Sequence, residues 1–301
     1  MTNFLIITSK EDIASMNIRD NFLRNEDYQF TKLNQKWHNY PLYQLKEILN
    51  HSKPFWKENK IYLGLTDSPL IFLDNLELEN TDIEPDLLIF ASRHRSKSGK
   101  PAFLAHTTGN WTKGADYGGK GKKISLSSAL LLKAGYLSLF EKVQENQAFK
   151  NFSVDIEVTH HGPTELEKPL IFMELGSSEK QWKIKEAGAL VAEAILEAII
   201  KYLSYLKKSS NQIGVGFGGT HYAPQFQKRI KKKNIAFSFI CPKYYLGNLD
   251  EGLIEQMISH NKEDVDFFAI DWSGTTSDDK AHLIPLLEKF KLPIKKTKDL
   301  K

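Results

Sequence analysis

Short apolar runs that alternate with helical patterns constrain the fold of this chain more than any other feature. Runs of four to eight apolar residues recur along its 301 residues, and longer segments with apolar residues three and four apart separate many of them. This alternation is typical of α/β proteins. We therefore predict a single α/β domain over residues 1–301, with one continuous, mixed or mostly parallel sheet flanked by helices. The predicted strands cover residues 4–8, 61–65, 70–73, 87–91, 101–105, 152–159, 170–175, 213–217, 235–240 and 265–270.

Turn and capping signals locate some of the connections. The sequence Thr66-Asp67-Ser68-Pro69 separates two apolar runs, so residues 61–65 and 70–73 are expected to pair as a hairpin. The clearest helix is predicted over residues 180–207, where an apolar stripe follows a capping box of Ser178 and Gln181. Further helices are predicted over residues 125–145, 248–260 and 278–289.

Histidines and acids gather at or just beyond the carboxyl ends of the predicted strands. Ligands bind α/β sheets outside these strand ends, so side chains that are far apart in sequence can converge there on one pocket. The free amides at the start of helix 180–207 would face the same pocket. The strand-end residues are His94, His106, His160, His161, Glu174, His221 and Asp271.

The predicted strand 152–159 is amphipathic and ends in two adjacent histidines. Alternation places Asp155, Glu157 and Thr159 together on a polar face. His160 and His161 would point to opposite faces if the strand continued, but Gly162-Pro163 breaks it. A single histidine at a strand end is more often a satisfied polar residue than a ligand, whereas convergence from several strands favours a functional site.

The residue types at these strand ends favour a metal site. Neutral imidazoles and carboxylates are zinc ligands in proteins. The single cysteine, Cys241, excludes an internal disulfide and a thiolate-rich zinc finger, and it follows an apolar run that favours a buried structural thiol. No serine lies in a Gly-x-Ser-x-Gly sequence, which argues against a covalent α/β-hydrolase mechanism.

Basic clusters suggest a nucleic-acid partner, although the net charge of +4 is modest. Phosphate backbones favour such clusters because each neutralised phosphate releases counterions. A solvated lysine-rich surface is the alternative. The clusters are Arg93, Arg95, Lys97 and Lys100; Lys120, Lys122 and Lys123; and Lys228, Arg229, Lys231, Lys232 and Lys233.

Two glycine-rich segments match nucleotide-binding loops only in spacing. Residues 214–219 fit Gly-x-Gly-x-x-Gly, but Pro224 stands where the helix should begin and no acid occurs before Asp250. Residues 114–120 are spaced like a Walker A loop, but Gly121 stands at the position of the magnesium-binding hydroxyl. The first segment is better explained as backbone that approaches a ligand closely and directs His221. The second is expected to be a substrate-contacting or plain surface loop.

Five segments of the chain resemble the zinc-dependent D-aminoacyl-tRNA deacylase family of archaea and plants. Their order and specificity make a chance match improbable, and together they span most of the chain beyond residue 80. They are residues 91–96 (ASRHRS), 103–111 (FLAHTTGNW), 158–165 (VTHHGPTE), 172–179 (FMELGSSE) with Trp182, and 216–224 (GFGGTHYAP).

The resemblance implies hydrolysis of the ester between a D-amino acid and the 3′ ribose of tRNA, with Zn²⁺ as cofactor; whether one or two ions are bound stays open at this stage. It also implies a cytoplasmic enzyme with a phosphorylase/hydrolase-like α/β fold related to peptidyl-tRNA hydrolase. On these motifs we assign metal binding to His106, His160 and His161, and acid–base catalysis to His94, Glu174 and His221. The division between ligands and acid–base groups stays open at this stage, as does a metal-free mechanism.

Substrate contacts are assigned to the basic and glycine-rich segments: Arg93, Arg95, Gly218, Gly219, Thr220, Lys228, Lys231 and Lys232. Backbone at Gly218 and Gly219 is the candidate wall that excludes one hand of the amino acid.

Two other classes of function stay open: a peptidyl-tRNA-hydrolase-like or zinc carboxypeptidase-like hydrolase, and a noncatalytic RNA-binding protein. No run of eighteen apolar residues and no signal-peptide pattern occurs, so no membrane association is expected, and a monomer is expected.

Overall fold

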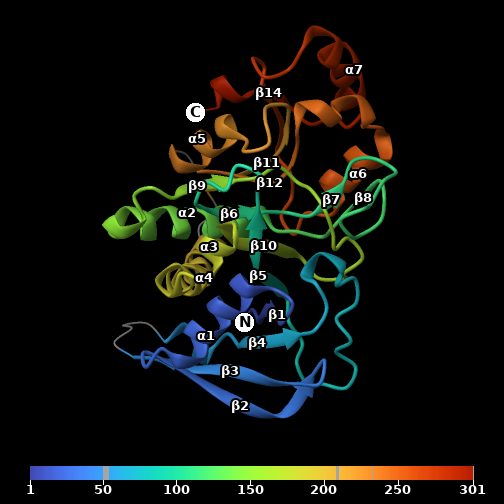
Figure 1. Cartoon of the computed structure of the whole chain (residues 1–301). Coiled ribbons are helices and arrows are strands. Elements are labelled where there is room, and N and C mark those ends of the chain that lie inside the picture. The colour runs from blue at the N-terminus through green and yellow to red at the C-terminus, as the bar shows by residue number, and fades with distance from the viewer. Residues whose placement is uncertain (50–53, 208–209, 233, 301) are drawn as a thin grey trace.

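Two sheets, rather than one continuous sheet, organise the molecule (Figure 1). The computed structural model describes residues 1–49, 54–207, 210–232 and 234–300. Within these residues an eight-stranded sheet has the order β2-β3-β4-β1-β5-β10-β6-β9, and a four-stranded sheet has the order β12-β11-β13-β14. The large sheet comprises β1 (Phe4–Ser9), β2 (Tyr28–Trp37), β3 (Tyr40–Ile48), β4 (Ile61–Thr66), β5 (Leu87–Arg95), β6 (Ala102–His106), β9 (Ser153–Ile156) and β10 (Leu170–Ser177).

The smaller sheet is all parallel, whereas the large one is mixed. The large sheet has antiparallel pairs β2–β3, β3–β4 and β6–β10, and its other pairs are parallel. The predicted α/β class with a mixed, mostly parallel sheet and flanking helices is therefore confirmed. The second sheet comprises β11 (Gln212–Phe217), β12 (Ile235–Cys241), β13 (Phe267–Ile270) and β14 (Ile294–Lys296), and a separate small ribbon comprises β7 (Gly109–Asn110) and β8 (Lys123–Ile124).

The helices cover these sheets, and α4 packs against both α1 and α2. One apolar cluster joins buried side chains of both sheets and includes Phe4, Phe103 and Phe237, whereas alternate residues of the large sheet, such as Leu5 and Phe90, belong to a second cluster. None of the described helices is long and apolar enough to cross a membrane. The helices are α1 (Ile13–Arg24), α2 (Ala129–Glu145), α3 (Glu179–Trp182), α4 (Lys185–Leu206), α5 (Pro224–Lys232), α6 (Glu251–Ser259) and α7 (Ser277–Glu288).

The predicted hairpin of residues 61–65 and 70–73 is wrong. Leu70–Phe72 is a turn of 3-10 helix after Pro69, and β4 is flanked by β1 on one side and β3 on the other. Strand β4 pairs in parallel with β1 and antiparallel with β3. Strands β2 and β3 were not predicted, although β2 alternates half-buried and exposed residues along much of its length.

The predicted helix over residues 180–207 is two helices, α3 and α4. The capping box of Ser178 and Gln181 is present, but the helix breaks at Ile184. The side chain of Asn17 on α1 donates hydrogen bonds to the carbonyl oxygens of Trp182 (2.9 Å) and Ile184 (2.8 Å). These bonds satisfy carbonyl groups at the break, so an interaction with a distant helix stabilises it. Helix α5 does begin at Pro224, a residue favoured in the first turn, contrary to the expectation that no helix starts there.

The predicted strand 152–159 ends earlier than expected, at Ile156. The next residues cross to the second sheet: the Val158 amide donates to the His221 carbonyl at 2.9 Å, and the Thr159 amide donates to the Ile240 carbonyl at 3.0 Å. This crossing segment, residues 157–161, therefore lies between the two sheets, where the functional side chains meet.

Candidate functional site

Seven titratable side chains from separate parts of the sequence form one cluster where the two sheets meet. Strands β5, β6 and β10 supply His94, His106 and Glu174, the loop after β11 supplies His221, and the crossing segment supplies the others. The cluster borders a cavity of about 1230 Å³. All of its members except the fully buried His106 line the cavity wall. The members are His94, His106, Glu157, His160, His161, Glu174 and His221.

Three histidines form the inner part of the cluster. The ring centroids of His106 and His160 are 4.3 Å apart, and those of His160 and His161 are 4.4 Å apart. Both adjacent histidines enter the site because the strand ends before them and His161 adopts a left-handed backbone conformation, with φ of 44°. The rule that neighbouring strand residues face opposite sides therefore does not apply here.

Backbone carbonyl groups fix the tautomers of these three rings. Each Nδ1 lies within hydrogen-bonding distance of a carbonyl oxygen: Thr107 for His106 (3.1 Å), Val158 for His160 (2.7 Å) and Gly162 for His161 (2.7 Å). Because a carbonyl only accepts, Nδ1 carries the proton, and Nε2 of each neutral ring keeps its lone pair. The His106 Nε2 is buried and has no hydrogen-bond partner.

Glu157 is the functional residue that the sequence analysis missed as a site residue. Its side chain is fully buried, and its Oε1 lies 3.2 Å from His94 Nε2 and 2.8 Å from His221 Nε2. Its Oε2 is buried without a hydrogen-bond partner. The alternation of apolar and polar residues predicted that Glu157 lies on the polar face of a strand. In the structure its side chain is directed into the histidine cluster. A carboxylate three residues before a His-His pair was the available signal.

Hydrogen bonding indicates that His94 is protonated. Ser177 Oγ donates its single proton to the Lys100 carbonyl at 2.7 Å, so it accepts from His94 Nδ1 at 2.9 Å. Since His94 Nε2 also faces the carboxylate of Glu157, both ring nitrogens act as donors, which requires the imidazolium form. Burial disfavours that charge, but the hydrogen bond and charge of Glu157 prevail, and the pKa of His94 is raised.

The remaining pKa shifts divide the cluster into neutral and charged groups. Burial lowers the pKa of His106 to about 4 and that of His161 to about 3, and it lowers that of His160 well below its usual value. Burial opposes ionisation of Glu157, but hydrogen bonds from His221 and His94 hold its pKa well below the usual range. Burial and the charge of Glu157 raise the pKa of Glu174 well above its usual value.

These residues fit a divalent metal ion of the zinc type. Three sets each place one potential ligand atom per residue within 4.8 Å of the others: His106, His160 and His161; Glu157, His160 and His221; and His106, Glu157 and Glu174. Unpaired buried atoms, His106 Nε2 and Glu157 Oε2, belong to these sets. Imidazole nitrogens whose other nitrogen donates to a carbonyl are typical zinc ligands.

Basic and aromatic side chains surround the mouth of the cavity. Arg93, Arg95 and Lys97 line it, as do Tyr117 of the glycine-rich loop and Tyr244. Arg93 donates to the Glu11 carbonyl at 3.1 Å and lies over the Trp182 ring. The residues predicted from the first basic cluster are thus close to the site, and the loop of residues 114–120 reaches it.

Other predicted contacts lie outside the cavity lining. Gly218 and Gly219 have positive φ, and side-chain carbons added there would meet Thr275 and Asp271 rather than the cavity. Asp271 is likewise absent from the cavity, because its carboxylate accepts from Ser273 and the Gly274 amide. The glycines therefore hold the backbone that leads through Thr220 to His221. Their contact with substrate stays a prediction.

Helix α5, which carries the third predicted basic cluster, also lies outside the histidine cavity. Lys228, Lys231 and Lys232 are exposed on it, and Lys233 lies outside the described residues. Contact between these lysines and the substrate stays a prediction as well.

Comparison with known proteins identifies the family. The D-aminoacyl-tRNA deacylase family model matches residues 81–295. The chain belongs to this family. It is 34% identical over 277 residues to a D-aminoacyl-tRNA deacylase of Thermococcus kodakarensis, covering 91% of this chain and 92% of that protein. It is 37% identical over 249 residues to that of Methanocaldococcus jannaschii, covering 81% of this chain and 91% of that protein.

A solved structure extends the similarity to the fold. The crystal structure of AF0625, a conserved protein of unknown function, aligns with a TM-score of 0.82 and 30% identity. The alignment covers 100% of this chain and 97% of that one. The first eighty residues, which precede the family model, are therefore part of the shared fold.

Proposed function

We propose that the protein hydrolyses the ester between a D-amino acid and the 3′ ribose of tRNA, with a zinc ion held by His106, His160 and His161. Family membership supports the ester hydrolysis and the tRNA substrate. The metal rests on one observation, the three imidazoles whose Nδ1 atoms donate to backbone carbonyls and whose Nε2 lone pairs remain for a ligand. A zinc ion there would polarise the ester carbonyl and lower the pKa of a nearby water.

The protein's own residues supply proton transfer and positioning. Glu157 holds His94 and His221 by one oxygen, which fixes both rings beside the histidine triad. His221 is 37% exposed at the cavity wall, and its Nδ1 faces the Tyr244 hydroxyl, so it can exchange a proton with water. We assign to it the acceptance of the proton from the attacking water.

His94 then acts as the acid. Its imidazolium can protonate the 3′ oxygen of the ribose as the bond between this oxygen and the acyl carbon breaks. The new bond joins the water oxygen to the acyl carbon, so the products are a free amino acid and tRNA with a 3′ hydroxyl. The Oε1 of Glu174 lies 3.7 Å from His106 Nε2. We assign to Glu174 one of two roles, a further metal ligand or a proton carrier.

The decisive experiment offers the purified protein matched D- and L-aminoacyl-tRNA, with and without a chelator. We expect rapid cleavage of the D ester, little cleavage of the L ester, and a loss of activity with chelator of about 100-fold or more that zinc reverses. Equal rates for both hands would contradict the proofreading role. A rate that is insensitive to complete zinc removal would contradict the metal mechanism alone.

Zinc content provides a readout that does not depend on activity. The variant His106→Ala should lose bound zinc as measured by atomic absorption, because it removes one of three ligands. His282→Ala is the matched control, since that ring contacts the Leu249 carbonyl at 3.1 Å and lies outside the cluster. Equal zinc content in the two variants would exclude His106 as a ligand.

A further inference from the structure

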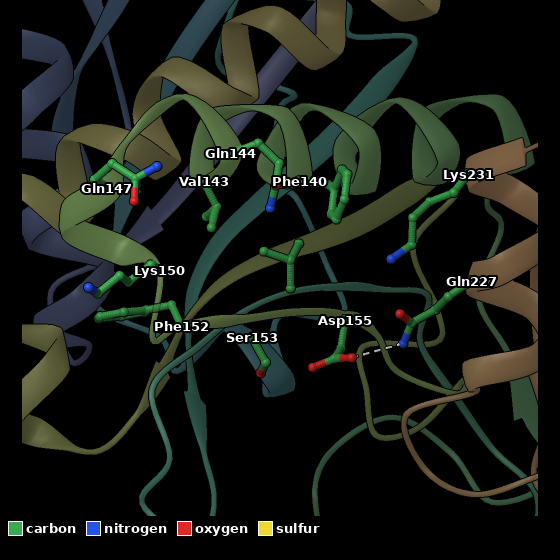
Figure 2. A pocket seen from close by; sticks show the side chains of 11 residues that line it. Phe140, Val143, Gln144, Gln147, Lys150, Phe152, Ser153, Asp155, Gln227 and Lys231 are labelled. Carbon is green, nitrogen blue, oxygen red and sulfur yellow. Dashed lines mark hydrogen bonds between the residues drawn. The ribbon is translucent and has the colours of Figure 1, made fainter.

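A second pocket, distinct from the histidine cavity, lies between the end of α2, the strand β9 and the helix α5. It has a volume of about 340 Å³, within the usual range for small-molecule sites, and none of its lining residues lines the larger cavity. Figure 2 shows side chains of all three elements directed into it. Its lining comprises Phe140, Val143, Gln144, Gln147, Lys150, Phe152, Ser153, Val154, Asp155, Gln227 and Lys231.

The lining combines two cations with two aromatic rings. Lys150 and Lys231 stand on opposite sides of the pocket, and the Lys231 ammonium lies 4.4 Å from the ring centroid of Phe140. Among the described residues, neither lysine forms an ion pair with a carboxylate. Their positive charge is therefore available to an anionic ligand, and phosphate is the anion that clusters of basic residues beside aromatic rings recognise in nucleic acids.

Hydrogen-bonding groups at the pocket floor suit a nucleobase. Asp155 Oδ1 accepts from Gln227 Nε2 at 3.0 Å, and its second oxygen accepts no hydrogen bond from the described residues, so it can accept from an exocyclic amino group. Gln144 and Gln147 are exposed at the rim and offer both donors and acceptors. Half-buried Phe140 and Phe152 provide the apolar surface that a base requires.

The pocket is connected to the catalytic site through one segment of chain. Asp155, near the end of β9, lines this pocket, and Glu157, two residues later at the start of the crossing segment, lines the histidine cavity. Gln227 reinforces the link, because it accepts from the Tyr136 hydroxyl and also donates to the carbonyl of Tyr222, the neighbour of His221. The two cavities therefore border the same short segment, and an RNA whose 3′ end occupied the histidine cavity would cross the edge of the large sheet to reach this pocket.

We propose that this pocket binds one nucleotide of the RNA substrate, upstream of the terminal nucleotide that carries the ester. Lys150 and Lys231 contact its phosphate, Phe140 and Phe152 contact its base, and Asp155 accepts from the base edge. The proposal rests on the proposed function, because it assumes an RNA-linked ester. The proposal also suggests how the basic residues of α5 contact the RNA. Lys231 lines the pocket and lies on the same helix as the other exposed lysines, so these would contact the RNA beside the pocket.

Two variants test the pocket by independent means. Lys150→Gln removes an exposed charge, and Ser153→Phe fills the pocket from the exposed edge strand without any change of charge. The matched control is Lys32→Gln on β2, at the opposite edge of the same sheet. For each protein, kcat and KM are measured with intact D-aminoacyl-tRNA and with D-aminoacyl-adenosine, which lacks the upstream nucleotide.

Both pocket variants should raise KM for the tRNA ester by about 10-fold, while turnover of the adenosine ester and of the control protein changes by less than about 2-fold. An unchanged tRNA KM in either pocket variant would overturn the proposal, and so would an equal increase in Lys32→Gln. Failure of the unaltered protein to cleave any D-aminoacyl ester would instead contradict the proposed function.

Discussion

At the scale of single residues, hydrogen-bond partners determine which histidine has which role. His106, His160 and His161 donate from Nδ1 to backbone carbonyls, so each neutral ring keeps the Nε2 lone pair that the proposed zinc site requires. His94 meets a serine oxygen on one side and a carboxylate on the other, which makes it a cation. Glu157 links the two groups of histidines, and its position explains why residues that look alike in sequence differ in charge.

The exchange Glu157→Gln should therefore reduce kcat for the D-aminoacyl ester by about 100-fold or more, because the charge that stabilises protonated His94 is lost and the two rings lose a common acceptor. Thermal unfolding should show that the variant still folds. Glu167→Gln, an exchange of an exposed glutamate, is the control and should leave kcat unchanged. A kcat for Glu157→Gln equal to that of the control would exclude Glu157 from the reaction.

At the scale of elements, some helices and strands end where the local sequence pattern predicts that they continue. Contacts between distant segments stabilise these ends. Asn17 of α1 stabilises the break between α3 and α4 through two carbonyl groups. The break positions α3, whose Trp182 indole donates to the His94 carbonyl at 3.0 Å. A helix that continued from residue 180 would move this support away from the site.

Asn17→Ala should lower the free energy of unfolding by about 1–3 kcal/mol, because in a partly buried setting the Trp182 carbonyl loses its partner and the Ile184 carbonyl, which also accepts from the amides of Ala187 and Gly188, loses one of three donors. Urea denaturation measures the change. Asp20→Ala, which removes an exposed ion pair with Arg24 on the same helix, should change it by less than about 1 kcal/mol. Equal losses in the two variants would show that Asn17 has no special role at the break.

Helix α5 is the element for which the sequence predicts contact with tRNA. Reversing charge at Lys228, Lys231 and Lys232 together should weaken tRNA binding and reduce its dependence on salt, because fewer counterions are released. Binding is measured at several salt concentrations by filter retention. The control reverses the exposed charges of Lys32, Lys36 and Lys46 on the β2–β3 hairpin. If both triple variants bind tRNA equally well and with the same salt slope, α5 is only a solvated surface.

At the scale of the whole molecule, the two sheets share an apolar core and the cluster of histidines and glutamates. The crossing segment donates backbone hydrogen bonds to residues of the second sheet, and His94 on β5 and His221 after β11 contact the same carboxylate. Separation of the sheets would therefore expose apolar surface and dismantle the site at once. The single domain stays a prediction, which equilibrium unfolding tests.

With zinc present, urea denaturation should show one cooperative transition, with coincident curves from tryptophan fluorescence and circular dichroism. The midpoint should not depend on protein concentration, as expected for the predicted monomer. Two separated transitions would show that the sheets unfold as independent domains, whereas a concentration-dependent midpoint would indicate an oligomer.

The sequence by itself determined the α/β class, most strand positions and the strand-end placement of the site histidines, because these depend on local periodicity and on the geometry of strand ends. Only the tertiary structure decided which strands neighbour β4, where the sheet divides in two, and that His160 and His161 both face inward, because these depend on contacts between distant segments. The same holds for Glu157 and Asp271. Glu157 lies within a predicted strand and Asp271 directly follows one, but the first is buried between two histidines and the second closes a turn.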